Sequence, residues 1–152
     1  MDSGISEVSF KLRRMHANDL ALVFKWRNHK SIRTVSETDI AIPMHAHISW
    51  FNKSHDICKW IFEVEGKPNG VFLFDRSSSF WSFYVAPGRV RRRRLSYALL
   101  SSAVIVLTAM GVKTIKARVK HDNKASQKLH QHFGFEWFDT DENLVYTLVR
   151  SL

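Results

Sequence analysis

The sequence predicts a single α/β (α+β) domain over residues 1–152, with a mixed central β-sheet flanked by helices on both faces. Three observations lead to this prediction. The length of 152 residues and the 45% hydrophobic content suit one globule with one sizeable core. Segments with the two-residue period of strands alternate with segments of helical period. No internal repeat, linker or low-complexity stretch divides the chain.

The first third of the chain is predicted to be mainly helical. Apolar and polar residues alternate over residues 8–12, which predicts a short strand. Asn18 is the expected N-cap of a helix that reaches Asn28. Residues 30–42 are polar with isolated apolar members, so we expect a loop or a broken helix there. Pro43 then begins a second helix.

The rest of the chain combines strands with two further helices. Residues 59–64 and 71–75 favour strands, and residues 65–70 are typical of the hairpin turn between them. A strand at 80–85 precedes an arginine run and a four-turn amphipathic helix that ends at Gly111. The remaining elements are a strand at 114–119, a helix from Asn123 to Gly134, and strands at 135–138 and 144–149.

The composition restricts the environment and the partners of the protein. A single cysteine, Cys58, cannot form an internal disulfide, and no apolar stretch is long enough to span a bilayer. We therefore expect a cytoplasmic protein that does not insert into a membrane. The formal net charge of +9 favours anionic partners, among which nucleic acid, an acidic membrane face and phosphorylated small molecules all qualify.

Most of the concentrated charge lies in one turn, at Arg89 and residues 91–94. The N-terminus of a helix carries unpaired N–H groups and a partial positive charge, and guanidinium groups bind phosphate oxygens in pairs. Such a run is also typical of a solvated face or of an RNA or membrane patch. Because it lies between a strand and the most amphipathic helix, we favour a pocket for a phosphate or a pyrophosphate.

These segments resemble the GNAT superfamily of N-acetyltransferases. The family's pyrophosphate-binding pattern, Arg/Gln-x-x-Gly-x-Gly/Ala, corresponds to residues 91–96, with arginine and serine in place of its two glycines. The family's Asn-x-x-Ala/Ser…Leu-Tyr…Gly-Phe segment corresponds to residues 123–135. The resemblance covers almost the whole chain. It implies a GNAT-like fold and an enzyme that uses acetyl-CoA as co-substrate.

The resemblance also implies which residues contact the coenzyme and carry the chemistry. A strand that diverges from its neighbour leaves N–H groups free for the thioester, which places the oxyanion donor near Val85. The family's thiolate-protonating tyrosine falls on His130, for which an exposed helix histidine without a catalytic part is the alternative. The amine is expected either to arrive neutral or to lose its proton through water, with Tyr84 nearby. The residues expected at the coenzyme are Phe83, Tyr84, Val85, Arg91, Arg92, Arg93, Arg94, Leu95, Ser96, Asn123, Ser126 and Phe133.

A narrower resemblance concerns the front helices, in Trp26-Arg27-Asn28-His29, Ile32-Arg33 and His47-x-x-Trp50-Phe51. They are similar to the PseH-type acetyltransferases, which modify the 4-amino group of UDP-linked deoxysugars in pseudaminic acid biosynthesis. This resemblance implies that Arg27 and His47 lie near the nucleotide phosphates and Trp50 beside the base. Core packing is the alternative for Trp50, and a buried carboxylate is the alternative partner for Arg27. Ser36 and Glu37 stand where that group has an apolar and aromatic pair.

The sequence thus predicts an N-acetyltransferase for a small-molecule primary amine, with the amino group of a nucleotide-linked sugar as the leading acceptor. Arg27, Arg33 and Arg76 would meet its phosphates. A protein N-terminus, a polyamine or an antibiotic amine are the alternatives on the same fold, although a basic protein disfavours a polycationic acceptor. A non-catalytic nucleic-acid-binding module is the competing class. No metal is expected, because the histidines near Cys58 lack the spacing of a zinc site.

Overall fold

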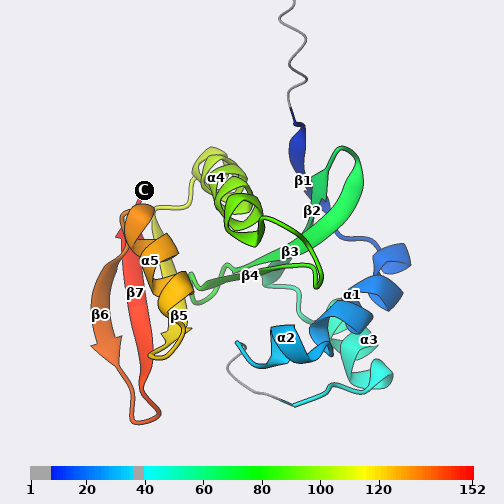
Figure 1. Cartoon of the computed structure of the whole chain (residues 1–152), viewed down its shortest axis with the longest axis horizontal. Coiled ribbons are helices and arrows are strands. Elements are labelled where there is room, and N and C mark those ends of the chain that lie inside the picture. Colours follow the sequence, from blue (N-terminus) through cyan, green and yellow to red (C-terminus); the bar gives the residue numbers. More distant parts are fainter. Residues whose placement is uncertain (1–7, 36–39) are drawn as a thin grey trace, which may run out of the picture.

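The computed structural model describes residues 8–35 and 40–152, and its strands form two antiparallel sheets (Figure 1). The four-stranded sheet has the order β1-β2-β3-β4, and the three-stranded sheet has the order β5-β7-β6. The strands are β1 (Phe10–Arg14), β2 (Ile57–Val64), β3 (Lys67–Asp75), β4 (Trp81–Val85), β5 (Thr114–Lys120), β6 (Glu136–Thr140) and β7 (Val145–Ser151).

One parallel bridge, between Phe80 and Lys116, joins the two sheets at the start of β4. Beyond this bridge β4 and β5 diverge, since no further ladder pairs them in the described chain. The two sheets together therefore form a mixed sheet that is opened like a V, which confirms the predicted fold class. The edge of β4 that faces away from β3 is left without a strand partner.

Helices cover both faces of the four-stranded sheet (Figure 1). The helices are α1 (Leu20–Arg27), α2 (Lys30–Arg33), α3 (Met44–Lys53), α4 (Arg92–Ala109) and α5 (Lys124–His132), with a 3-10 turn at Ala17–Asp19. α4 and α5 pack on one side of the sheets, and α1 to α3 pack on the other. None of the helices in the described part of the chain combines the length and the apolar character that crossing a membrane requires.

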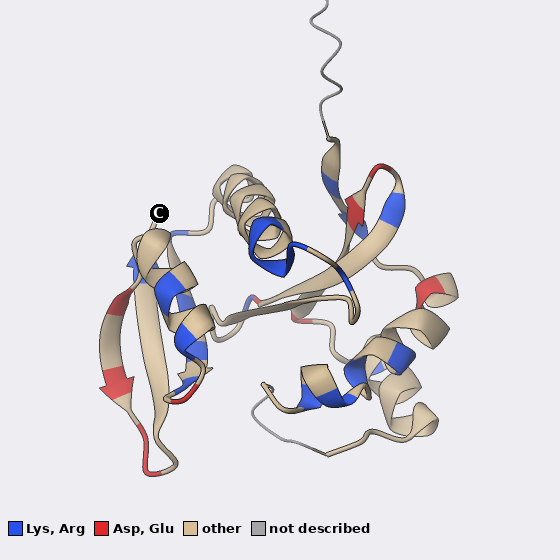
Figure 2. Ribbon diagram, viewed as in Figure 1, with Lys and Arg blue, Asp and Glu red and all other residues tan. Residues whose placement is uncertain are grey.

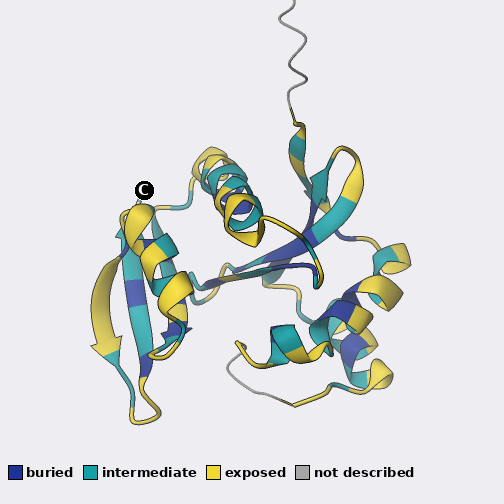
Figure 3. Cartoon of the chain, viewed as in Figure 1, coloured by how far each residue is buried: buried dark blue, intermediate teal, exposed yellow. Residues whose placement is uncertain are grey.

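Alternate side chains of the central strands pack into two cores on opposite faces of the sheet. Figure 3 shows that buried residues are concentrated on these strands. Phe62 and Phe72 face α4, where Leu99, Ala103 and Leu107 are fully buried at helical spacing. Ile61 and Val71 face the opposite side and pack with Val23 and Trp26 of α1. The side chains of β4 divide in the same way, so Phe83 belongs to the α4 side and Tyr84 to the α1 side.

Several element boundaries differ from the prediction. Asn18 is not the N-cap of α1, because it lies in the 3-10 turn before the helix and Asp19 is the N-cap. The β2–β3 turn is confined to Glu65 and Gly66, whose φ angles of 52° and 76° are those of a two-residue hairpin turn. The prediction that residues 65–70 form the turn is therefore wrong, because Lys67 to Gly70 already belong to β3. α4 begins at Arg92 rather than after the arginines, so three of them form its first turn.

Candidate active site

The turn from β4 into α4 combines exposed arginines with free backbone N–H groups. Arg91 caps α4 in the left-handed conformation, with φ 58° and ψ 44°. The Leu95 N–H group bonds to the Arg91 carbonyl at 3.1 Å, whereas the N–H groups of Arg92, Arg93 and Arg94 have no partner among the described residues. All four arginine side chains are exposed, and Figure 2 shows this cationic start of α4. The arrangement suits a diphosphate group.

Arg89 differs from the four arginines that follow it. Its Nε donates to Asn69 Oδ1 at 2.7 Å, and its two Nη atoms donate to the carbonyls of Pro68 and Pro87 at 3.3 and 3.2 Å. The guanidinium group also lies 6.0 Å from the ring centre of Trp26. Arg89 therefore fixes the turn to β3 and is not free to bind an anion.

The free edge of β4 presents the N–H groups of Phe83 and Val85. Hydrogen bonds from Ala86 N to Asn69 O and from Asp75 N to Phe80 O, both 2.8 Å, fix which residues of β4 bond to β3. Since bonded and non-bonded pairs alternate in an antiparallel ladder, the N–H groups of Phe83 and Val85 point away from β3. This geometry fits the predicted donors for a thioester oxygen.

The structure places His130 in the core, with 2% of its surface exposed. Its Nε2 accepts a hydrogen bond from Trp81 Nε1 at 2.9 Å, and its Nδ1 lies 2.7 Å from the Ser126 carbonyl oxygen. Burial lowers the pKa of His130 to about 4, against which the Ser126 carbonyl acts to raise it. The expectation of an exposed helix histidine is wrong. Both ring nitrogens have partners, so this geometry speaks against the predicted role in protonating a thiolate.

The other predicted coenzyme residues on α5 lie at its two ends. Asn123 caps the helix, because its Oδ1 accepts a hydrogen bond from Ser126 N at 3.2 Å. Phe133 follows the last turn, and its ring centre lies 5.2 Å from that of Tyr97 on α4. The last turn of α5 is thus tied to the Trp81 end of β4 through His130, and Phe133, which follows that turn, contacts α4.

Arg27 and Tyr84 come together on the α1 side of the sheet. Arg27 Nη1 is buried and has no hydrogen-bond partner among the described residues. Burial raises the pKa of Tyr84 above its usual value, and the nearby Arg27 charge acts to lower it. A protonated phenol and an unpaired guanidinium nitrogen are therefore near one another, and this pair suits an anionic ligand.

His47 and Trp50 lie deeper than the resemblance implied. His47 is 4% exposed, its Nε2 lies 3.2 Å from the Leu20 carbonyl oxygen, and burial lowers its pKa. Its ring stacks on Trp50 at 5.5 Å between ring centres, and Lys59 Nζ lies 5.1 Å from the Trp50 ring centre. A neutral His47 has no charge to offer a phosphate, and its contacts are those of core packing.

Two further residues of the prediction lie apart from this group. Arg76 lies in the turn between β3 and β4, at the opposite end of β4 from Val85, and its Nη2 donates to the His55 carbonyl at 3.0 Å. This position does not fit the predicted contact with substrate phosphates. Ser36 and Glu37 lie outside the described residues.

Sequence reasoning missed two residues that shape the site. At Gly70 an added Cβ would lie 2.6 Å from the Tyr84 carbonyl oxygen, so β3 approaches β4 more closely here than a side chain permits. In the sequence Gly70 was the last residue of the expected hairpin turn, which hid its place within β3. Lys120 Nζ donates to the Thr34 carbonyl at 3.1 Å and so links β5 to α2 across 86 residues, without any local signal.

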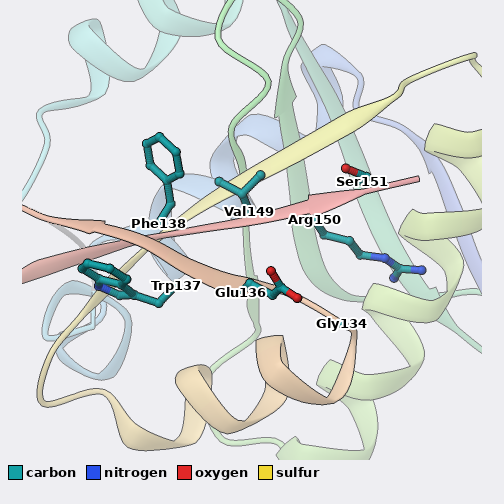
Figure 4. Close-up of a pocket in the computed structure, with 7 residues that line it drawn as sticks. All are labelled: Gly134, Glu136, Trp137, Phe138, Val149, Arg150 and Ser151. Atoms are coloured by element: carbon teal, nitrogen blue, oxygen red, sulfur yellow. The ribbon is translucent and has the colours of Figure 1, made fainter.

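A surface hollow lies elsewhere, on the β6–β7 edge (Figure 4). In that view Phe138 and Val149 project to one side of the ribbon and Trp137 to the other. None of the predicted site residues lines this hollow. Across residues 8–35 and 40–152, no group of three or more His, Cys, Asp or Glu side chains is placed to hold a metal ion.

Comparison with known proteins agrees with this geometry. Residues 20–135 match the model of the Acetyltransferase (GNAT) family. The chain is 25% identical over 145 residues to the acetyltransferase PseH of Campylobacter jejuni, which covers 90% of this chain and 89% of that protein.

Two solved structures share the fold. The structure of Campylobacter jejuni N-acetyltransferase PseH matches with a TM-score of 0.71 and 20% identity over 93% of this chain and 97% of that one. The structure of AAC(6')-Ib in complex with ribostamycin and coenzyme A matches with a TM-score of 0.80 and 17% identity over 94% of this chain and 93% of that one.

Proposed function

The chain belongs to the Acetyltransferase (GNAT) family and is an acetyl-CoA-dependent N-acetyltransferase, and from this premise we propose that its acceptor is the 4-amino group of a nucleotide-linked deoxysugar. Likeness to PseH supports this acceptor. AAC(6')-Ib, which is crystallised with an aminoglycoside, has the same fold, so the fold alone does not select between the two classes of acceptor.

The observation that carries the proposal is the buried, unpaired Nη1 of Arg27 beside Tyr84. A guanidinium group that is removed from water needs an anionic or hydrogen-bonding partner, and none of the described residues supplies one at Nη1. A nucleotide diphosphate brings such a partner. A polycationic aminoglycoside or polyamine brings charges of the wrong sign.

The residues that we propose for acetyl-CoA and those that we propose for the acceptor lie on different sides of β4. Acetyl-CoA supplies the activated acyl group, and the free N–H groups and arginines at the start of α4 fit its pyrophosphate. The N–H groups of Phe83 and Val85 fit the thioester carbonyl oxygen, on which negative charge develops when the amine attacks. The raised pKa of Tyr84 keeps its phenol protonated, so we assign Tyr84 to orienting the acceptor and not to removing its proton.

The direct test is an acetylation assay with four acceptors: a UDP-4-amino-deoxysugar, the same amino sugar without its nucleotide, an aminoglycoside and a polyamine. We expect the highest kcat/KM for the UDP-linked sugar and a large loss when the nucleotide is removed. Preferential acetylation of the aminoglycoside or the polyamine would refute the proposed acceptor.

Replacing Arg27 tests the contact that carries the proposal. Arg27→Gln is expected to raise KM for the UDP-amino sugar by roughly 30-fold or more, since removing one partner of a desolvated charge pair costs about 2 kcal/mol or more. Unfolding temperature should fall little, because Nη1 has no protein partner to lose. Lys25→Gln removes an exposed charge from the same helix and serves as the control. Equal KM values in the two variants would exclude a phosphate contact at Arg27.

The arginine turn is expected to determine coenzyme affinity. The triple variant Arg92→Gln/Arg93→Gln/Arg94→Gln should raise the Kd for coenzyme A about tenfold, because each exposed charge near phosphate contributes up to about 1 kcal/mol. The remaining affinity should depend less on salt concentration. Isothermal titration calorimetry at two salt concentrations measures both effects.

A matched control separates this effect from net charge. Lys11→Gln/Lys25→Gln/Lys113→Gln removes three exposed charges away from the turn. We expect this variant to bind coenzyme A like the unmodified protein. If the two triple variants bind coenzyme A equally well, the start of α4 is not the pyrophosphate site.

A further inference from the structure

Within the described residues, the backbones of the two sheets are joined at one point, where β4 and β5 begin to diverge. The backbone link is the single bridge between Phe80 and Lys116, with a hydrogen bond of 2.8 Å from Lys116 N to Ser79 O. The divergence matters for catalysis, because the free edge of β4 lies on the side that opens. Whatever sets the spacing between β4 and α5 therefore also sets the space available to a thioester at that edge.

His130 lies directly beside this bridge. Its hydrogen-bond donor, Trp81, is the residue next to Phe80 in the chain. Its ring centre lies 4.9 Å from that of Phe135 and 5.8 Å from that of Phe83. The same imidazole is also bonded to the Ser126 carbonyl, one turn earlier in its own helix α5. One buried side chain thus connects β4, α5 and the segment that leads into β6.

We propose that His130 is a positioning residue, which holds α5 at a fixed distance from β4 and so shapes the acetyl-CoA site at the free edge of β4. The inference depends on the coenzyme site and not on the identity of the acceptor. Phe83, whose N–H group belongs to that free edge, is two residues from Trp81 on the same strand. We therefore expect a displacement of Trp81, caused by loss of its hydrogen bond to His130, to displace the N–H group of Phe83 as well.

The chemistry of the bond explains why a neutral imidazole occupies this place. The indole N–H group of Trp81 is buried and needs an acceptor, while the Ser126 carbonyl, which belongs to the hydrogen-bond ladder of α5, can accept a second bond from a donor. An imidazole protonated on Nδ1 meets both needs at once. Glutamine also carries an acceptor oxygen and an NH2 donor group on its amide, but it cannot transfer a proton to a thiolate. Phenylalanine fills similar space and meets neither need.

This difference gives a decisive pair of variants. His130→Gln should keep both kcat and the Kd for coenzyme A within about threefold of the unmodified protein, whereas His130→Phe should raise that Kd about tenfold with a much smaller change in kcat. If His130 were instead a general acid, the opposite result would be expected. Both variants would then lose about 10²-fold or more in kcat and bind coenzyme A normally, and that result would overturn the proposal.

Trp81→Phe provides a second, independent measurement if His130→Phe does not fold. It removes the same hydrogen bond from the other side, so it should also weaken coenzyme A binding. The double variant Trp81→Phe/His130→Phe should bind coenzyme A more tightly than the sum of the two single changes predicts, because neither polar group is then left unpaired. Strict additivity in this cycle would contradict a direct coupling.

The readouts are chosen so that this inference and the proposed acceptor fail separately. Calorimetry with coenzyme A needs no acceptor, and kcat is measured with whichever amine the acceptor panel identifies. His55→Gln makes the same chemical change at an exposed histidine and should leave both quantities unchanged. Normal coenzyme A affinity in both His130→Phe and Trp81→Phe would refute the positioning role, whatever the acceptor is.

Discussion

Between pH 7 and pH 4 the protein is expected to lose about 3 kcal/mol of unfolding free energy through His130 alone. Burial lowers the pKa of this imidazole from its ordinary 6.5 to about 4 in the folded protein. As the pH falls below 6.5, the imidazole binds a proton in the unfolded chain, whereas in the folded protein it does not bind one until about pH 4. The stabilisation is therefore complete above pH 6.5 and is lost through this window, at about 1.4 kcal/mol for each pKa unit.

Other titrating groups can be separated from this effect. Burial also lowers the pKa of His47, which acts in the same direction. The hydrogen-bonded carboxylates of Asp19 and Asp75 have pKa values below their ordinary 3.8, so their contributions are lost at lower pH. The measurement is urea unfolding of the unmodified protein and of His130→Gln at intervals from pH 7 to pH 4.

The difference between the two proteins isolates His130. Between pH 7 and pH 4, we expect the unfolding free energy of His130→Gln to fall by about 3 kcal/mol less than that of the unmodified protein. His55→Gln, the same substitution at an exposed histidine, is the control. Parallel curves for the unmodified protein and His130→Gln would mean that the buried imidazole does not remain neutral.

The fold could be predicted from the sequence because the residues with the clearest apolar periodicity are also the residues that are buried. Leu99, Ala103 and Leu107 are fully buried on α4, as their helical spacing predicted. The start of α4 was placed too late, since apolar periodicity begins at Leu95 while the exposed arginines before it show none. Arginine is a good helix former, and backbone propensity rather than burial extends the helix to Arg92.

The backbone part of the candidate site follows most directly from the sequence. The free N–H groups of β4 and of the first turn of α4 follow from the order of strand, turn and helix, which the sequence shows. The environment of a side chain depends on distant residues. The prediction that His130 is exposed is wrong, because the side chain packs inward to accept a hydrogen bond from Trp81, which is 49 residues away in the sequence. His47 likewise lies against the Leu20 carbonyl of another helix, which no local pattern indicates.

The second large effect is expected from a single methyl group at Gly70. In Gly70→Ala the added Cβ would lie 2.6 Å from the Tyr84 carbonyl oxygen and 3.4 Å from the Val85 Cα, so β3 or β4 must move. Overpacking of this kind costs about 1–3 kcal/mol of unfolding free energy. Because the displaced backbone carries the Val85 N–H group, we expect kcat to fall toward the roughly 10²-fold loss that accompanies removal of one oxyanion donor.

Stability and catalysis can be distinguished by a second glycine. Gly66 has a φ of +76° and open space around it, so Gly66→Ala strains the backbone without a clash. It should cost about 1–2 kcal/mol of unfolding free energy, comparable to Gly70→Ala, and leave kcat unchanged because the hairpin tip is remote from the free edge of β4. Urea unfolding and steady-state kinetics on both variants show whether the loss of kcat is separate from the loss of stability. If Gly70→Ala loses stability but keeps its kcat, the Val85 N–H group does not stabilise the oxyanion, since a displaced donor could not have served the reaction equally well.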